Sequence, residues 1–404
     1  MKFSVLLPTR NRLDLLRYAV ETVLRQDYAD WEIIISDNDS EQDVAGYVQS
    51  LHEPRIKYFR TGSFIPVTDN WNNALEKSTG NFMVMLGDDD GLMQGCFSTL
   101  RGLVERYGPP DFIYTNALLY AYPGVIPTYP EGYLQPIGYA EFLRTTTTPF
   151  WLDKSTALRQ VRQAMNFRMS YGYNMQYAVI SRGLIDRLKE KGEFFQSPYP
   201  DFYAMNLMML KAERILICPF PLVTIGISPK SFGYYYFNRQ EREGTEFLKN
   251  LPKPELARSL EQVILPGTDM NTSWLLAMET IRLNCGAEEE SLRVNYRRYR
   301  LLQMIRVYSW LAMEPDSAKV LHRQLWGKLK IGERCLGACF WLMAKMLSVL
   351  PRARRQQAVN LLFVLTGIGM SFFPKKIVGR YRNIVEVFER IDPLASCSAP
   401  VERG

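Results

Sequence analysis

The sequence predicts an α/β fold, with a mostly parallel β-sheet flanked by helices, followed by an α-helical C-terminal domain. Over the first hundred residues, short apolar runs alternate with helix patterns, which is typical of parallel sheets covered by helices. Polar clusters follow three of these apolar runs directly, and beyond about residue 240 only helix patterns remain. At 404 residues the chain is too long for one core, so we expect two domains, residues 1–239 and 240–404.

The apolar periodicity places the elements in order along the chain. In the first domain it predicts strands over residues 3–7, 31–35, 56–59, 82–86, 112–115 and 215–219. Between these strands it predicts helices over 13–26, 43–51, from about 70, 96–107 and 203–211. Residues 120–155 are rich in Tyr, Pro, Gly and Thr and are expected to form long loops over a cleft. In the second domain, helices are expected over 254–265, 272–284, 288–313, 316–329, 336–350 and 358–373.

Composition excludes several classes of protein. Apolar residues make up 47% of the chain, as in globular and unlike disordered proteins. Only two histidines and six scattered cysteines are present, which argues against a histidine-rich metal site, a zinc cluster and a Ser-His-Asp triad. The opening residues 1–8 form a strand-like run ended by Pro8 rather than a secretory signal. We therefore expect reduced thiols and a cytoplasmic chain.

The net charge of +7 is concentrated in the second domain. Residues 1–239 carry 24 Lys and Arg against 25 Asp and Glu, whereas residues 240–404 carry 25 against 17. The apolar stretches 336–350 and 358–373 are shorter than the ~20 residues of a spanning helix, and basic residues at 352–355, 375–376 and 380–382 flank them. This pattern favours helices lying on the cytoplasmic face of an anionic membrane, with a buried hairpin or a homodimer interface as alternatives. No nucleic-acid-reading motif is present, so we expect no nucleic-acid partner.

Three adjacent carboxylates, Asp88, Asp89 and Asp90, end the apolar run 82–86 and its Gly87. Like charges in this arrangement repel one another unless a cation neutralises them, and a hard divalent cation with oxygen ligands does so while accepting substrate oxygens. The alternative is a solvated acidic turn. Two other predicted strands are also followed directly by polar clusters, at residues 9–12 and 36–40. In parallel sheets, ligands bind beyond the carboxyl ends of the strands. We therefore expect a binding site at the edge where these three clusters lie.

The ordered set of residues 8–12, 34–40 and 80–90 resembles the family 2 glycosyltransferases of GT-A fold, and the likeness covers about residues 1–235. The resemblance implies an inverting transferase that moves a sugar from a nucleotide-sugar, with a UDP-sugar as the expected donor. A hydroxyl of a glycan or of a polyprenyl-linked glycan is the implied acceptor. Two alternatives remain: a sugar nucleotidyltransferase, which would normally carry a glycine-rich loop after the first strand, and a non-catalytic binding module of the same fold.

The resemblance also implies roles for individual residues. Pro8, Thr9, Arg10 and Arg12 would line the nucleotide pocket, and either Asp37 or Asp39 would bind the base, although a local Asx turn explains both equally well. Asp88 would contact the ribose, and Asp89 with Asp90 would hold Mn²⁺ or Mg²⁺. We add Asn70, Asn73 and Lys230 as candidate contacts of the nucleotide-sugar. The histidine that many relatives carry near Lys230 as a metal ligand is missing from this chain.

Asp201 is the candidate general base. It follows Pro198 and Pro200 at the start of a helix pattern, and the resemblance places an acceptor-activating carboxylate about this far beyond the aspartate motif. An N-cap role is the alternative, because aspartate is a preferred capping residue. Asp153 and Glu193 are the second candidates for the base.

Overall fold

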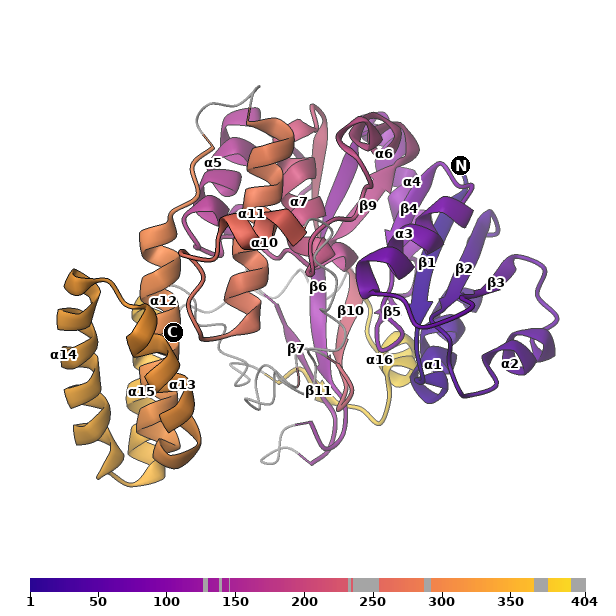
Figure 1. Ribbon diagram of the computed structural model, residues 1–404. Helices are drawn as coiled ribbons and strands as arrows, with labels where there is room; N and C mark the ends of the chain where they lie inside the picture. The colour runs from indigo at the N-terminus through magenta and orange to yellow at the C-terminus, as the bar shows by residue number, and fades with distance from the viewer. Residues whose placement is uncertain are drawn as a thin grey trace.

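The computed structural model describes residues 1–125, 130–137, 140–144, 146–231, 234, 254–286, 292–366 and 377–393. A mixed β-sheet with flanking helices forms the N-terminal part, and helices follow it in the C-terminal part (Figure 1). The predicted fold class is therefore confirmed. The expected domain boundary at residues 239 and 240 lies outside the described residues, and so does the end of the expected helix 358–373, from residue 367 onward.

The first half of the sheet follows the predicted alternation. Strands β1, β2, β3 and β4 are parallel and lie in the order β4-β1-β2-β3. Their carboxyl ends therefore meet at one edge. The elements are β1 (Phe3–Thr9), α1 (Leu13–Leu24), β2 (Trp31–Asp37), α2 (Val44–Ser50), β3 (Ile56–Arg60), α3 (Val67–Lys77), β4 (Phe82–Met85), β5 (Gly91–Leu92) and α4 (Cys96–Tyr107).

The second half of the sheet contains the antiparallel pairings that the sequence did not predict. Strand β9 (Ala178–Ser181) lies between β4 and β6 (Phe112–Ala121) and is antiparallel to both. β6 and β10 (Ile215–Ile227) are much longer than expected and are parallel to each other. The region expected to form loops contains two short strands. These and the remaining elements are β7 (Tyr133–Pro136), η1 (Glu141–Leu143), β8 (Phe150–Leu152), α5 (Lys154–Met165), η2 (Met175–Tyr177), α6 (Arg182–Leu188), η3 (Lys189–Lys191) and α7 (Pro200–Lys211).

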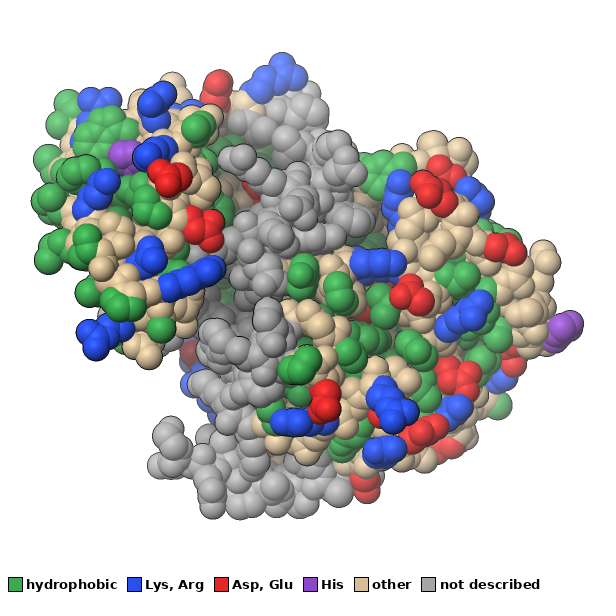
Figure 2. All heavy atoms as spheres, turned by 90° about the horizontal axis from the view of Figure 1, so that it is seen from below, with side chains coloured by type: hydrophobic (Ala, Val, Ile, Leu, Met, Phe, Trp, Pro, Cys, Tyr) green, Lys and Arg blue, Asp and Glu red, His purple; other side chains and the backbone are tan. Residues whose placement is uncertain are grey.

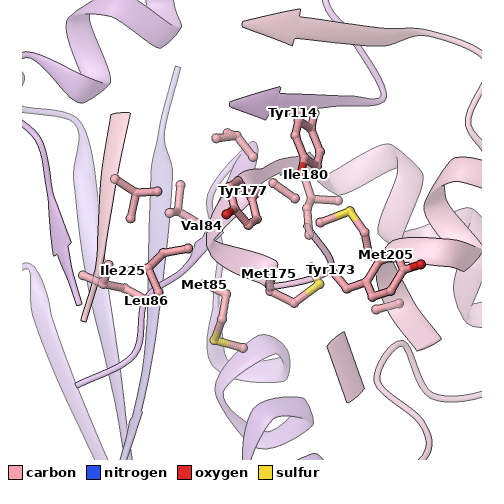
Figure 3. Packing of buried hydrophobic residues seen from close by; sticks show 14 of the residues in the cluster. Val84, Met85, Leu86, Tyr114, Tyr173, Met175, Tyr177, Ile180, Met205 and Ile225 are labelled. Carbon is pink, nitrogen blue, oxygen red and sulfur yellow. The ribbon is translucent and has the colours of Figure 1, made fainter. Parts of the chain in front are cut away.

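Apolar and aromatic side chains fill the space between β4, β10 and η2. Figure 3 shows Met85 and Leu86, at the end of β4, between Ile225 of β10 and Met175 of η2. Tyr177 stacks on Tyr114 of β6, with ring centroids 5.3 Å apart and planes 3° from parallel. This packing fixes the chain on both sides of the carboxyl end of β4, where the three aspartates follow.

The C-terminal helices are joined to the sheet domain by α11 (Asp269–Cys285), which packs against α7. Trp274 of α11 is buried, and its indole N–H donates to the carbonyl of Ala164 over 3.0 Å. A second hydrophobic cluster is centred on α12 (Tyr296–Met313), against which the later helices pack. The other helices are α10 (Pro254–Ser259), α13 (Pro315–Lys328), α14 (Ile331–Ser348) and α15 (Arg352–Thr366). No described helix has the length and apolar character that crossing a bilayer requires.

The last described segment returns to the N-terminal half of the chain. β11 (Gly379–Arg380) pairs with β7, and α16 (Ile384–Arg390) lies beside α1 (Figure 1). The hydroxyl of Tyr120 donates to the carbonyl of Tyr381 over 2.8 Å. The C-terminal part is therefore not a purely helical appendage, because residues 377–393 belong structurally to the sheet domain.

Glu32 of β2 is a buried carboxylate that holds three neighbouring segments together. It accepts hydrogen bonds from Lys2 (2.8 Å), from Ser4 of β1 (2.7 Å), from Lys57 of β3 (2.7 Å) and from the amide of Thr79 (2.6 Å). Burial by itself would raise the pKa of Glu32, but the hydrogen bonds from Lys2, Lys57, Ser4 and Thr79 lower it below its usual range. The charged form is therefore the one that the fold stabilises.

We predict that Glu32→Gln lowers the free energy of unfolding by about 2–4 kcal/mol, because both lysines lose their charged partner and buried donors are left poorly matched. Since the pKa is lower in the folded than in the unfolded state, the contribution of Glu32 is complete above pH ~4.3 and is lost as the pH falls below that value. Urea denaturation from pH 7 to pH 3 measures both effects. Glu105→Gln, which removes an exposed ion pair with Arg101, is the matched control and should change stability by less than about 0.5 kcal/mol. Equal effects of the two substitutions would contradict this account.

Candidate functional site

The three aspartates form a tight turn at the carboxyl end of β4, and each is tied to a different part of the fold. The amide of Asp90 donates to the carbonyl of Gly87 over 3.1 Å, which closes the turn. All three side chains are at least nine-tenths buried in the described structure. We call residues 87–90 the aspartate loop.

Asp88 faces the carboxyl end of β1. Its two carboxylate oxygens accept hydrogen bonds from the Thr9 hydroxyl (2.8 Å) and from the Arg12 guanidinium (2.9 Å). Arg12 also donates to the carbonyl of Lys230. Burial raises the pKa of Asp88, while the Arg12 charge opposes that rise and the neighbouring Asp89 adds to it. The first polar cluster and the aspartate loop therefore meet, as the sequence predicted.

Asp89 faces the segment that follows β10. Its Oδ2 accepts a hydrogen bond from the Ser228 hydroxyl over 2.8 Å and lies 3.9 Å from the Arg12 guanidinium. The Tyr122 hydroxyl donates to the main-chain carbonyl of Asp89 over 3.1 Å. The other carboxylate oxygen, Oδ1, accepts no hydrogen bond from the described residues. Asp89 is therefore the member of the loop that keeps a carboxylate oxygen available to a ligand.

Asp90 has both oxygens occupied by the protein. Oδ1 accepts from the amide of Gly226 (2.8 Å), and Oδ2 accepts from the amide of Gly87 (2.8 Å) and from the Gln176 side chain (2.7 Å). Burial and the charge of Asp89 raise the pKa of Asp90 to about 7 in spite of these hydrogen bonds. These contacts connect the aspartate loop to β10 and η2, so the side chain braces the loop.

A pocket of about 350 Å³ opens beside the aspartate loop. One wall is polar and is formed by the carboxyl ends of β1, β2 and β4. A second part of the lining, the aromatic wall, includes Trp71, Tyr173, Tyr177, Tyr199 and Phe202. The lining includes Pro8, Thr9, Arg10, Arg12, Asn38, Asn70, Trp71, Asp88, Asp89, Asp90, Tyr173, Gln176, Tyr177, Tyr199, Asp201, Phe202 and Ile225. The volume is within the range of small-molecule sites in proteins.

Asp201 lines this same pocket, from the first turn of α7. The N-cap of α7 is Tyr199, and Asp201 accepts at Oδ1 from the amide of Phe202 over 2.9 Å. No described side chain donates a hydrogen bond to the carboxylate. Burial raises the pKa of Asp201 to about 7, and the Phe202 amide opposes the rise only in part. A carboxylate with that pKa, facing a pocket, is chemically suited to accept a proton near neutral pH.

Several predicted residues lie away from the pocket. Asp37 is fully buried, and its oxygens accept from the Tyr58 hydroxyl (2.7 Å) and the Ser40 amide (3.0 Å). Asp39 is half-buried and forms an ion pair with Arg60 (2.9 Å). Asn73 donates to the Ser36 hydroxyl (2.7 Å), and the Lys230 ammonium donates to the carbonyl of Asn11 (3.1 Å). None of these four side chains belongs to the lining of the pocket.

The second candidates for a base also lie elsewhere. Asp153 caps α5, where it accepts from the amide of Thr156 over 2.8 Å, and Glu193 is exposed. Neither belongs to the lining of the pocket. Asp201 is therefore the one of the three candidates that the structure places beside the aspartate loop.

Sequence reasoning missed lining residues on three elements. Asn38 follows β2 directly and takes the place at the pocket wall that was expected of Asp37 or Asp39. Trp71 of α3 and Gln176 of η2 also line the pocket. Asn38 lies within the polar cluster 36–40, so the sequence could have predicted it as a site residue. The sequence could not predict Gln176, because only the pairing of β9 with β4 and β6 brings η2 to the aspartate loop.

Comparison with known proteins confirms the resemblance. Residues 4–171 match the family described as "Glycosyl transferase family 2". The matched part of the chain, which contains the aspartate loop and most of the polar wall, is similar to this family.

Curated relatives match the same region. The chain is 42% identical over 102 residues to a GalNAc(5)-diNAcBac-PP-undecaprenol beta-1,3-glucosyltransferase of Campylobacter jejuni, covering 24% of this chain and 33% of that protein. It is 30% identical over 136 residues to the putative colanic acid biosynthesis glycosyl transferase WcaA of Escherichia coli, covering 32% of this chain and 49% of WcaA. It is 29% identical over 87 residues to the UDP-Glc:alpha-D-GlcNAc-diphosphoundecaprenol beta-1,3-glucosyltransferase WfgD of Escherichia coli, covering 22% and 34%. The matches thus span less than half the length of each of these relatives.

Among solved structures, the chain is similar to residues 1–349 of TarS from S. aureus in complex with UDP-GlcNAc. The sequence identity is 14% and the TM-score is 0.46, with 89% of this chain and 92% of that chain covered.

We predict that Gly226→Ala disrupts the aspartate loop, because a Cβ at this position would lie 1.8 Å from the carbonyl oxygen of Asp89. Moving that backbone breaks the hydrogen bond from the Gly226 amide to Asp90 and should cost about 2–4 kcal/mol of stability. Thermal denaturation and nucleotide binding measure the two effects. Gly183→Ala in α6, where a Cβ meets nothing within 4 Å, is the control and should be neutral or slightly stabilising. An unchanged Gly226→Ala protein would contradict the described fit of β10 against the loop.

Proposed function

We propose that this chain is an inverting glycosyltransferase, which moves a sugar from a nucleotide-sugar to a hydroxyl group of a glycan acceptor. The observation that carries the proposal is the pairing of two chemically different carboxylate sites in one pocket. The aspartate loop lies at the carboxyl ends of β1 and β4, and Asp201 lies on the first turn of α7. The first site suits a diphosphate with its counter-charges, and the second suits a proton acceptor.

The polar wall has the groups that a nucleoside diphosphate needs. Thr9 and Arg12 are fixed by Asp88, so the Arg12 guanidinium is held beside the loop before a ligand arrives. Arg10 lies with its guanidinium carbon 4.1 Å from the centre of the Phe64 ring and donates to the carbonyl of Asn38 over 3.3 Å. Asn38 and Asn70 also line this wall, with their side-chain amides fixed by hydrogen bonds to Ile65 and to Ser36 respectively. UDP is the expected nucleotide, because WfgD carries UDP-Glc in its name.

The carboxylate oxygens of the aspartate loop suit a divalent cation that the protein and the substrate hold together. Enzymes of this family generally use such a metal. Among the described residues no group of three or more His, Cys, Asp or Glu is arranged to hold a metal ion. Asp89 has one open oxygen, and Mg²⁺ or Mn²⁺ bound by one or two carboxylates normally completes its shell with phosphate oxygens and water. We therefore favour Asp89 over Asp90 as the protein ligand. When bound, the cation would neutralise charge on the leaving diphosphate.

Asp201 would act on the acceptor. In the reaction the bond between the anomeric carbon and the diphosphate oxygen breaks, and the acceptor oxygen forms a new bond to the same carbon from the opposite side. Asp201 takes the proton from that hydroxyl as the bond forms. The aromatic wall that includes Tyr199 and Phe202 adjoins Asp201 and offers apolar faces on which a sugar ring can lie.

The acceptor class rests on the relatives. The Campylobacter enzyme and WfgD carry undecaprenol-linked acceptors in their names. A lipid-linked glycan would bring this chain to a membrane surface. The proposal therefore includes a peripheral position at a membrane. It also assigns sugar transfer to the sheet domain rather than to the helical region.

We predict that Asp201→Asn lowers the rate of sugar transfer by roughly 10²–10⁴-fold while UDP still binds, because only the proton acceptor is lost. In the wild type, log(kcat/KM) should rise with pH below about pH 7 and level off above it, since the pKa of Asp201 is about 7 and the base must be ionised. UDP release from a panel of UDP-sugars, with a lipid-linked saccharide as acceptor, measures both. The rising limb should be missing from the residual activity of Asp201→Asn.

Asp153→Asn and Glu193→Gln are the matched controls, because each removes a carboxylate that lies away from the pocket. Both variants should keep the wild-type rate and pH profile. The proposal would be wrong if Asp201→Asn remained fully active, or if no nucleotide-sugar in the panel was consumed by the wild type.

A further inference from the structure

Helix α14 has one buried side and a wide exposed side. Gly337 and Ala344 are buried against the cluster around α12, with Phe340 and Leu347 half-buried beside them. These positions are three or four residues apart and therefore share one face of the helix. Gly337 allows a close approach, because a Cβ there would lie 2.9 Å from the Tyr308 hydroxyl. The side of α14 that faces away from α12 is consequently open to solvent.

The exposed side is apolar along the whole helix. We call it the α14 outer face and define it by Ile331, Cys335, Ala338, Cys339, Leu342, Met346 and Val349, which recur at helical spacing and are all exposed. Ile331 is 85% exposed, Met346 72% and Val349 83%. Met343 and Leu350 extend the apolar surface on one flank. A contiguous apolar strip of this kind on a folded chain marks a surface that binds something.

Basic residues border this strip. Arg334 and Lys345 are exposed on the other flank of the outer face, and Lys345 lies 5.7 Å from the centre of the Trp341 ring. The only acidic residues in 315–366 are Asp316 and Glu333, paired with Lys319 (2.7 Å) and Arg300 (2.6 Å) respectively. The same segment carries nine basic residues: Lys319, Arg323, Lys328, Lys330, Arg334, Lys345, Arg352, Arg354 and Arg355. Figure 2 shows green hydrophobic and blue basic side chains intermixed over the helical region at its left.

We propose that the α14 outer face seats the protein on an anionic lipid surface, with the apolar strip in the interface and the flanking cations on the lipid headgroups. A helix with an exposed apolar face and basic borders has the chemistry of an interfacial helix. The sequence pointed to two apolar stretches, 336–350 and 358–373, and the proposal concerns the first of them, because side chains of the second are described only up to residue 362. The proposal does not depend on sugar transfer, because the binding it predicts needs no donor or acceptor.

Charge favours lipid over a second copy of this chain as the occupant. An isologous dimer through α14 would bring Arg334 and Lys345 of both copies to one apolar seam, without an unpaired described carboxylate in residues 315–366 to offset them. An anionic leaflet instead attracts each of these cations.

The test is sedimentation of the full chain with vesicles that contain phosphatidylglycerol and phosphatidylcholine, and with vesicles of phosphatidylcholine alone. We expect binding to the anionic vesicles, weakened by high salt. Leu342→Gln together with Met346→Gln should lower the partition coefficient by roughly tenfold or more, because two interfacial side chains become polar. Lys345→Gln should lower it about fivefold. All three positions are exposed, so the thermal midpoint should stay unchanged.

Leu283→Gln on α11 is the matched control, because it makes the same change at a side chain that is 51% exposed on another helix. It should leave vesicle binding unchanged. The proposal is wrong if the wild type does not bind anionic vesicles, or if the double variant binds as well as the wild type. It is also wrong if light scattering shows a dimer that the double variant dissociates while vesicle binding persists. That last result would assign the face to a second copy.

Two thiols on the outer face allow a direct measurement of insertion. Cys335 and Cys339 are exposed, whereas Cys96, Cys218 and Cys285 are buried, and Cys397 lies outside the described residues. In a Cys397→Ser protein, a polarity-sensitive fluorophore on these thiols should shift to the blue with anionic vesicles. The same label at Leu283→Cys, with both outer-face cysteines replaced by serine, should not shift. Equal spectra at the two sites would contradict seating through α14.

Discussion

The site depends on how the fold holds three buried carboxylates side by side at the end of one strand. Each aspartate of the loop is held by a different neighbour: Asp88 by Thr9 and Arg12 beyond β1, Asp89 by Ser228 beyond β10, and Asp90 by the Gly226 amide and by Gln176. These hydrogen bonds and the Arg12 charge offset the mutual repulsion of the carboxylates and connect the loop to its neighbours. The loop cannot move without disturbing β1, β10 and η2 together, so its geometry is set before a ligand binds.

The division of tasks within the loop follows from these contacts. Both oxygens of Asp90 accept hydrogen bonds from the protein, so Asp90 braces the loop, whereas Oδ1 of Asp89 accepts none from the described residues. Arg12 supplies a fixed positive charge next to both Asp88 and Asp89. Asp201 lines the same pocket from a separate helix, and burial rather than a charged neighbour raises its pKa. Under the proposed function, the region that binds the diphosphate and the group that accepts the proton therefore belong to separate elements, so a substitution can change one without changing the other.

Local signals in the sequence were sufficient for the parallel half of the fold and for the aspartate loop. Helix α4 begins and ends at the predicted residues 96 and 107, and the polar clusters after β1 and β4 meet as expected. Long-range pairing decided the rest. β9 has only four residues and is placed by β4 and β6, and α16 is placed by contacts with α1, which lies more than three hundred residues earlier. The polar cluster after β2 was recognised, but the backbone decides which of its members lines the pocket: Asp37 accepts a hydrogen bond from Tyr58, and Asn38 lines the pocket.

The measurement that tests the central claim most directly is calorimetric titration of UDP, dTDP and GDP, each with and without Mn²⁺, on the wild type and on Asp89→Asn. The account predicts metal-dependent binding of one nucleotide, weakened by roughly tenfold or more in Asp89→Asn, since the open carboxylate oxygen loses its charge. Asp39→Asn, which changes a half-buried aspartate away from the pocket, should bind like the wild type. If no nucleotide binds, or if Asp89→Asn binds with unchanged affinity and metal dependence, the aspartate loop is an acidic turn rather than a nucleotide-sugar site.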